Sequence, residues 1–182
     1  GKEIKITKPI DAMKNGIAYL PEDRKVDGIV GDLSVRDNII LAAQVLRGFF
    51  RPFSKAQANK FADEYIKLLE IKTASADTPI KSLSGGNQQK VIFGKWLERS
   101  PSVFMMDDPT RGIDVGAKYE IYELIINMAK QGKTIIVVSS EMPEILGITN
   151  RIGVMSNGRL AGIVNTKETN QEELLRLSAK YL

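Results

Sequence analysis

The sequence predicts an α/β fold, a layered sheet with helices packed on it, from three observations. Two apolar runs, Val103–Met106 and Thr134–Val138, flank a helical stretch, as expected for two buried parallel strands and their connecting helix. Two carboxylates follow the first run directly, at the strand end where parallel sheets bind ligands. A Ser-Gly-Gly turn, Ser84–Gly86, precedes another helical run, and such a helix start favours anions.

Length and composition are those of a soluble globular protein with one core. The 182 residues are 43% hydrophobic and 26% charged, and the net charge is +4. No dense basic run is present, so nucleic acid is not a predicted partner. The lack of cysteine and histidine excludes disulfides, thiolate and imidazole metal sites and histidine bases. No apolar run approaches the ~20 residues that span a bilayer.

The first quarter of the chain predicts short elements. Alternation in residues 1–6 predicts a strand, Pro9–Lys14 a helix that ends at Asn15-Gly16, and Ile17–Leu20 a second strand. A charged loop, Glu22–Lys25, follows. We expect a helical subdomain from Asp32 to Ala76.

That subdomain contains two capped helices. Ser34 caps a helix that Gly48 ends, and Ser54 with Gln57 forms a capping box for a helix running to about Ile71. A core stripe is expected on the second helix at Phe61, Tyr65, Leu68 and Leu69.

The remaining elements follow from periodicity and turn signals. Asn157-Gly158 predicts a hairpin, and Asn170 with Glu173 frames a helix start. The expected elements are helix 88–99, strand 103–106, helix 115–130, strand 134–138, helix 141–148, strands 152–155 and 160–164, and helix 170–181.

The chemistry of the two polar segments leaves alternatives open. Gly85 and Gly86 lack a Cβ and admit a phosphate close to the backbone, but a plain helix start with a flexible turn has the same appearance. The adjacent carboxylates of Asp107 and Asp108 repel each other, which costs free energy unless a cation or a reaction uses them. The alternative is a pair of aspartates that cap the next helix.

Three segments together resemble the ABC ATPase family. LSGGN at Leu83–Asn87 matches its signature motif, Asp107-Asp108 its Walker B end, and PTRGID, ending at Asp114, its D-loop. The wording is most similar to the second, C-terminal nucleotide-binding domain of bacterial ribose- and galactose-type sugar importers. IAYLPEDRK at Ile17–Lys25 and VVSSEMPEIL at Val137–Leu146 support that subclass, and the likeness covers nearly the whole chain.

The resemblance implies a fold and a set of site residues. The fold is a P-loop NTPase-type sheet, with the α/β core in 1–31 and 77–182 and the helical subdomain in 32–76. Asp107 is expected to bind Mg²⁺ and Asp108 to act on the attacking water. The residues expected to contact the nucleotide ATP are Leu83, Ser84, Gly85, Gly86, Asn87, Glu22 and Asp114.

Three positions depart from the family's pattern. Glu22 stands in the place of a glutamine and is interpreted as a modified switch residue, with a solvated charged turn as the alternative. Asp108 replaces the catalytic glutamate, and Ser140 replaces the switch histidine. A shorter carboxylate and a serine predict a weak or degenerate catalytic site in this half of the parent protein.

A P-loop pattern is not found. Gly132-Lys133-Thr134 follows a helix and precedes a strand, and Asn127 stands where the first glycine belongs. The chain begins at Gly1 rather than Met, so we expect an N-terminally truncated domain. The parent is expected to be an ATPase, whereas this fragment should be inactive alone and bind ATP and Mg²⁺ weakly or not at all.

The resemblance also implies partners and a location. We expect a transmembrane permease subunit and another nucleotide-binding domain in a head-to-tail sandwich, at the cytoplasmic face of the bacterial inner membrane. The phenylalanines of residues 49–53 either line a groove for a permease helix or pack into the subdomain core. Two other functions stay open: a non-catalytic interaction fragment, and a soluble ABC ATPase acting on nucleic acid or ribosomes. The sequence does not specify the sugar.

Overall fold

A computed structural model describes residues 3–48, 50–97 and 99–182. The chain divides into two compact units, the first ending at Val138 and the second spanning Ser139–Leu182. Among the described residues, no helix has the length and apolar character needed to cross a membrane.

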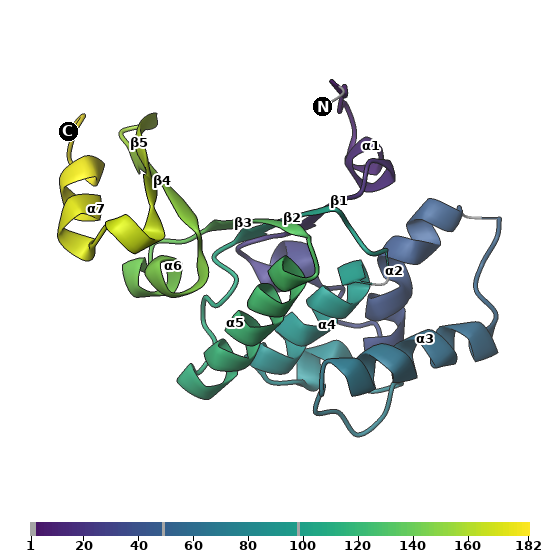
Figure 1. Ribbon diagram of the computed structural model, residues 1–182. Helices are drawn as coiled ribbons and strands as arrows, with labels where there is room; N and C mark the ends of the chain where they lie inside the picture. The colour runs from purple at the N-terminus through teal and green to yellow at the C-terminus, as the bar shows by residue number, and fades with distance from the viewer. Residues whose placement is uncertain (1–2, 49, 98) are drawn as a thin grey trace. The chain divides into compact units, whose positions relative to one another are not determined.

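The first unit is built on a parallel three-stranded sheet (Figure 1). Strand β2 (Val103–Asp107) lies between β1 (Ile17–Leu20) and β3 (Thr134–Val138), with Leu20 opposite Met106 and Met106 opposite Val137. Helix α5 (Val115–Lys130) connects β2 to β3. The predicted parallel strand–helix–strand unit is therefore confirmed, and the carboxyl ends of all three strands meet at one edge.

The prediction that these strands are buried on both faces is wrong. Ala18, Leu20, Phe104 and Met106 are at most 1% exposed. The alternate positions Tyr19, Met105, Ile136 and Val138 are between 39% and 58% exposed. Helices α4 (Gly85–Leu97) and α5 lie along one side of the sheet, so among the described residues the core forms on that side (Figure 1).

Helices α2 (Val35–Arg47) and α3 (Lys55–Leu68) pack against each other and against α4 (Figure 1). Both predicted caps are confirmed: Asp37 N donates to Ser34 Oγ, and Ser54 and Gln57 form the capping box. Helix α3 ends at Leu68, three residues early, because the chain turns into the left-handed region at Glu70. Leu68 is 62% exposed, so its assignment to the core stripe is wrong; the fully buried residue of that helix is Ala62.

The amino-terminal strand is not formed. Residues 3–7 have no regular structure, and Ile4 and Ile6 are 45% and 46% exposed. No described strand lies beside them, and an unpaired strand gains no ladder hydrogen bonds. The following helix, α1 (Pro9–Lys14), ends as predicted, with Asn15 at its C-cap and Gly16 in the left-handed region.

For Phe53 the structure supports the interpretation in which the loop packs into the subdomain, and the interpretation as a groove for a permease helix stays a prediction. Phe53 packs edge-on against Phe61, with ring centroids 5.3 Å apart, and the Arg47 guanidinium lies 4.6 Å from the Phe53 ring. Phe50 is 93% exposed. Phe49 lies outside the described residues.

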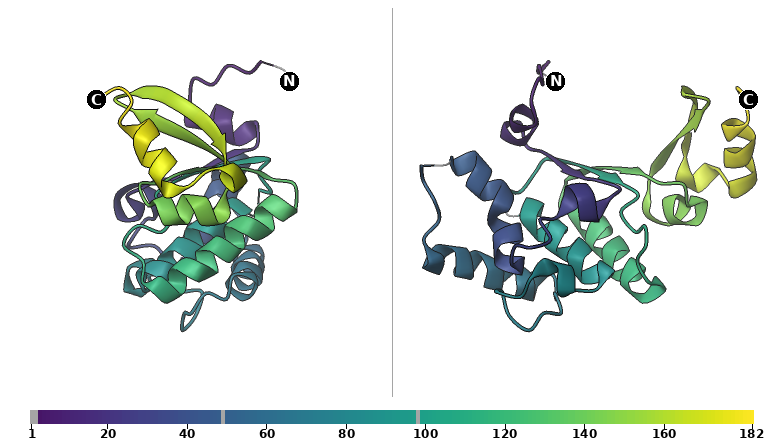
Figure 2. Two further views of the ribbon diagram at one scale, coloured as in Figure 1. Left: turned by 60° about the vertical axis from the view of Figure 1, so that its left-hand side comes forward. Right: turned by 180° about the vertical axis from the view of Figure 1, so that it is seen from behind.

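The second unit is a hairpin with two helices. Strands β4 (Arg151–Ser156) and β5 (Arg159–Asn165) pair antiparallel around Asn157 and Gly158, both in the left-handed region, so the predicted hairpin is confirmed. Helix α7 (Gln171–Ser178), capped by Asn170 as predicted, lies along the hairpin (Figure 2). Ile152, Val154 and Leu174 form the core, against which α6 (Met142–Ile148) packs.

A buried lysine gives the first unit a pH dependence. Lys95 of α4 is 8% exposed, its Nζ donates to the Gly28 carbonyl at 2.7 Å, and burial lowers its pKa to about 8. Between about pH 8 and 10 the unfolded chain binds a proton that the folded chain has lost, so stability should rise with pH by about 1 kcal/mol per unit.

Urea denaturation at several pH values measures this slope. Lys95→Met should flatten it, whereas Lys55→Met, at an exposed lysine, should leave it unchanged. An identical slope in the Lys95 variant would contradict the assignment.

Candidate functional site

The signature segment, Leu83–Asn87, forms the start of helix α4. The helix begins at Gly85, three residues earlier than predicted, and Gln88 N donates to Ser84 O at 2.9 Å. Asn87 links this turn to its surroundings, because its Nδ2 donates to Ser84 Oγ at 2.9 Å and its Oδ1 accepts from Lys72 N at 2.7 Å. Leu83 O accepts from the Gln88 side chain.

The packing of the protein itself leaves little room for a side chain at either glycine. A Cβ on Gly85 would lie 2.6 Å from Arg24 Nη2, and one on Gly86 would lie 2.7 Å from the Ala117 Cβ. Both distances are shorter than real Cβ contacts, so any side chain there must displace a neighbour. Sequence reasoning explained these glycines by ligand approach; the structure adds an internal reason for both.

The D-loop, Pro109–Asp114, joins β2 to α5. Asp108, with φ +41°, directs its N–H to Val138 O at 2.8 Å, and its own carbonyl accepts from Arg111 N. Asp114 is the residue that caps α5, accepting from Ala117 N at 3.0 Å. The alternative in which Asp107 and Asp108 cap the following helix is therefore wrong.

Asp107 ends β2 beside β1. Its carboxylate accepts from the Tyr19 hydroxyl at 3.3 Å. Burial, followed by the Asp107 charge, raises the pKa of Tyr19, which keeps the hydroxyl a donor.

This edge suits a magnesium ion that arrives with phosphates. Among the residues that the structure describes, no cluster of three or more acidic side chains could cage a metal. Mg²⁺ commonly binds one or two carboxylates and completes its shell with phosphate oxygens and water. The Asp107 carboxylate at the end of β2 could serve as one of those carboxylates, with phosphate oxygens and water as the other ligands.

Glu22 lies after β1 and forms an ion pair with Arg111 of the D-loop. The predicted charged loop is instead partly helical, because Arg24–Gly28 forms a π-helical turn, η1, capped by the Asp23 side chain. The Glu22 side chain is 45% exposed, which agrees with the alternative of a solvated charged turn. Its ion pair with Arg111 nevertheless links it to one particular residue of the D-loop.

Arg24 was missed by sequence reasoning, although it stands within the quoted IAYLPEDRK segment. Its Nη1 donates to Arg111 O at 2.8 Å, its Nη2 to Gly112 O at 3.3 Å, and its Nε to the Gln88 side chain at 3.3 Å. One guanidinium thus joins the D-loop to α4. The residue type alone carried no signal of this, because the partners are mostly backbone carbonyls distant in sequence.

Gln89 makes a second connection between the same segments. Its buried Nε2 donates to Pro109 O at 2.7 Å. Sequence reasoning assigned Gln89 no role. The side chain is only 3% exposed, but the start of this helix is rich in polar residues, so the hydrophobic periodicity did not indicate its burial.

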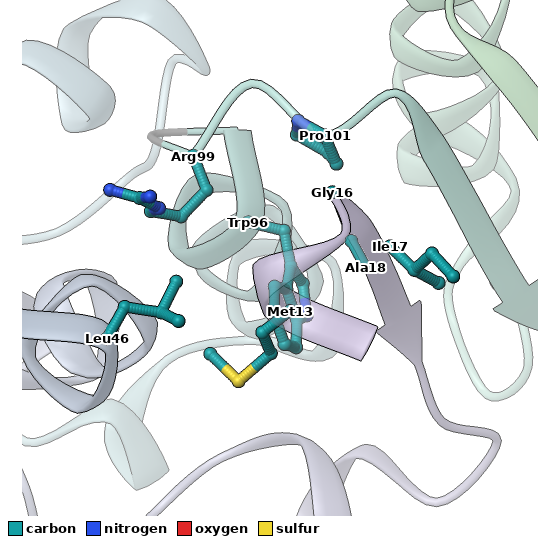
Figure 3. Close-up of a pocket in the computed structure, with 8 residues that line it drawn as sticks. All are labelled: Met13, Gly16, Ile17, Ala18, Leu46, Trp96, Arg99 and Pro101. Atoms are coloured by element: carbon teal, nitrogen blue, oxygen red, sulfur yellow. The ribbon is translucent and has the colours of Figure 1, made fainter. Parts of the chain in front are cut away.

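Two further features remain, one in each unit. Ser140 belongs to the second unit, where the preceding Ser139 Oγ accepts from Glu141 N. A small cavity in the first unit lies at the opposite, amino end of β1, and Trp96, Leu46 and Met13 point into it (Figure 3). None of the predicted site residues lines it.

Comparison with known proteins identifies the family. The model of the ABC transporter family matches residues 1–111, and the chain belongs to that family. The fold agrees: a dimeric ATP-binding cassette in a post-hydrolysis state, bound to ADP and phosphate, superimposes with a TM-score of 0.72 at 21% identity. That match covers 88% of this chain and 68% of the other.

Two curated proteins that share one name are similar to this chain in sequence. The galactose/methyl galactoside import ATP-binding protein MglA of Treponema denticola is 61% identical over 181 residues, and that of Treponema pallidum is 58% identical over 182 residues. Both matches cover 100% of this chain, which spans 36% and 37% of the relatives' length.

The contact between Gly86 and α5 gives a testable prediction. Gly86→Ala should cost about 1–3 kcal/mol of stability, because its Cβ meets the short Ala117 side chain, which cannot rotate away. Gly116→Ala is the matched control: its Cβ would have an ordinary contact of 3.5 Å, and the change should be neutral or slightly stabilising. Urea denaturation measures both; equal effects would contradict the packing argument.

Proposed function

We propose that this chain is part of the second nucleotide-binding domain of an ABC importer for galactose or a related sugar. The observation that carries the proposal is the assembly of three segments in one place: the signature segment, the D-loop and the loop after β1 are joined through Arg24, Glu22 and Gln89. The relatives' names supply the substrate class.

In this proposal the signature segment acts on a nucleotide held by another domain. Ser84, Gly85 and Gly86, with Leu83 and Asn87, present a hydroxyl and free helix N–H groups to the γ-phosphate. The 182 residues contain no P-loop pattern, so we assign the grip on that nucleotide's phosphates to a P-loop elsewhere in the assembly. This makes a head-to-tail pairing of two nucleotide-binding domains part of the proposal.

The residues at the end of β2 have separate roles. Asp107 would hold Mg²⁺ together with nucleotide oxygens, and the ion would neutralise charge on the phosphates. Asp108 would orient the attacking water, while Glu22 and Ser140 occupy the positions of the switch residues. Asp114, which caps α5, would set the D-loop at the domain contact. A permease at the inner face of the bacterial membrane is the proposed partner.

The departures at Asp108 and Ser140 can be tested by restoring the family's residues. The single variant Asp108→Glu and the double variant with Ser140→His should raise ATP turnover of the full-length protein several-fold, because the longer carboxylate reaches the water and the imidazole contacts the γ-phosphate. Steady-state phosphate release measures this. Asp108→Asn is the control and should stay at or below the wild type; no gain in either restored variant would refute the assigned roles.

The substrate class needs a transport measurement. Full-length protein reconstituted with its permease in vesicles should accumulate labelled galactose when ATP is supplied, and Ser84→Arg should abolish uptake by filling the signature segment. Arg51→Ala, outside that segment, should transport normally. Failure to take up galactose with ATP, together with association with ribosomes instead of the permease, would favour the alternative of a soluble ATPase.

Nucleotide binding by the isolated 182-residue chain provides a third test. Calorimetric titration with Mg-ATP should show no binding up to millimolar nucleotide, since a P-loop supplies most of the phosphate grip. Micromolar, magnesium-dependent binding would mean that residues of this chain replace that loop.

A further inference from the structure

We propose that Arg24 is a positioning residue that holds the D-loop against the first turn of α4, so that the two segments keep one relative placement. The guanidinium is half-buried and donates to two successive D-loop carbonyls and to one side chain of α4. Its planar fork of donors is suited to that geometry, whereas the three donors of a lysine ammonium all radiate from one nitrogen.

The backbone on both sides is shaped to receive this guanidinium. Gly112 has φ +65°, a conformation that glycine adopts without a steric cost. A Cβ on Gly85 would lie 2.6 Å from Arg24 Nη2 and 3.2 Å from its Cζ. The glycine at the helix start therefore makes room for Arg24, and a side chain there must push the guanidinium away from the D-loop.

The charges at the same place are complementary. Arg24 donates a hydrogen bond to the backbone carbonyl of Arg111. Glu22, two residues before Arg24, forms an ion pair with the Arg111 side chain. Two residues of the segment after β1 thus hold one residue of the D-loop. Glu22 places an opposite charge beside the Arg111 guanidinium, which reduces the repulsion between Arg111 and the nearby Arg24.

This role deepens the proposed function, on which its catalytic consequence rests. If the signature segment and the D-loop contact one nucleotide, their relative placement determines the geometry of the site. A misplacement of about 1 Å can lower a reaction rate by ~100-fold.

Hydrogen exchange of the full-length protein tests the link without reference to catalysis. Arg24→Ala and Arg24→Lys should both accelerate amide exchange in residues 110–114 by about tenfold, because the loop loses charge-assisted hydrogen bonds. Lys25→Ala removes the same charge from the exposed neighbour and should leave those amides unchanged. The β4–β5 hairpin serves as an internal reference. Unchanged exchange in both Arg24 variants would overturn the proposal.

A double-mutant cycle separates this role from simple packing. Gly85→Ala should reproduce the loop exchange of Arg24→Ala, and the double variant should add nothing further, because both changes break one link. Additive effects would mean that Gly85 and Arg24 act independently and would overturn the inference.

Turnover then connects the link to function. Arg24→Lys should lower kcat at least tenfold with KM unchanged, since the contact aligns the site rather than binding substrate. If the wild-type protein hydrolyses no ATP, the proposed function fails, and the exchange result still decides the role of Arg24. Normal kcat in a variant with a loosened D-loop would remove the catalytic consequence.

Discussion

Burial of helix α4 is the constraint on which the first unit depends. Val91, Ile92 and Phe93 are fully buried, and the helix packs against β1, η1, α2, α3 and α5. Close packing of this kind tolerates little displacement, since even one added carbon is felt in a dense core. The start of α4 is the signature segment, so the same burial that stabilises the fold also sets the position of Ser84–Gly86.

Polar contacts then tie the loops of the sheet edge to that helix. Arg24 and Gln89 donate to different D-loop carbonyls, and Lys95 donates to the carbonyl of Gly28, the last residue of η1. The contacts of Gln89 and Lys95 satisfy buried backbone carbonyls, which need a hydrogen-bond partner, whereas those of Arg24 lie nearer the surface. The loops are therefore parts of one hydrogen-bonded arrangement rather than flexible connections between the strands and helices.

Two constraints act on the glycines of the signature segment at the same time. In the proposed function a phosphate needs close access to the backbone at Gly85 and Gly86, and the protein's own Arg24 and Ala117 occupy the space where side chains would begin. Substitution at either glycine therefore changes internal packing before any ligand is considered. An assay of binding alone at these positions would combine the two effects, so stability has to be measured beside it.

The sequence by itself determined the elements whose signals are local. Ser34 and Ser54 cap helices and Asn157-Gly158 turns a hairpin, because each of these signals depends on neighbours within a few residues. The two apolar runs were predicted to be parallel strands from the helix between them, and they pair in that way. The motif wording also indicated the family. Only the tertiary structure decided the exposed face of the sheet, the early start of α4 and the role of Arg24. These depend on which distant segments pack together, and Arg24 and its D-loop acceptors are more than 80 residues apart in the chain.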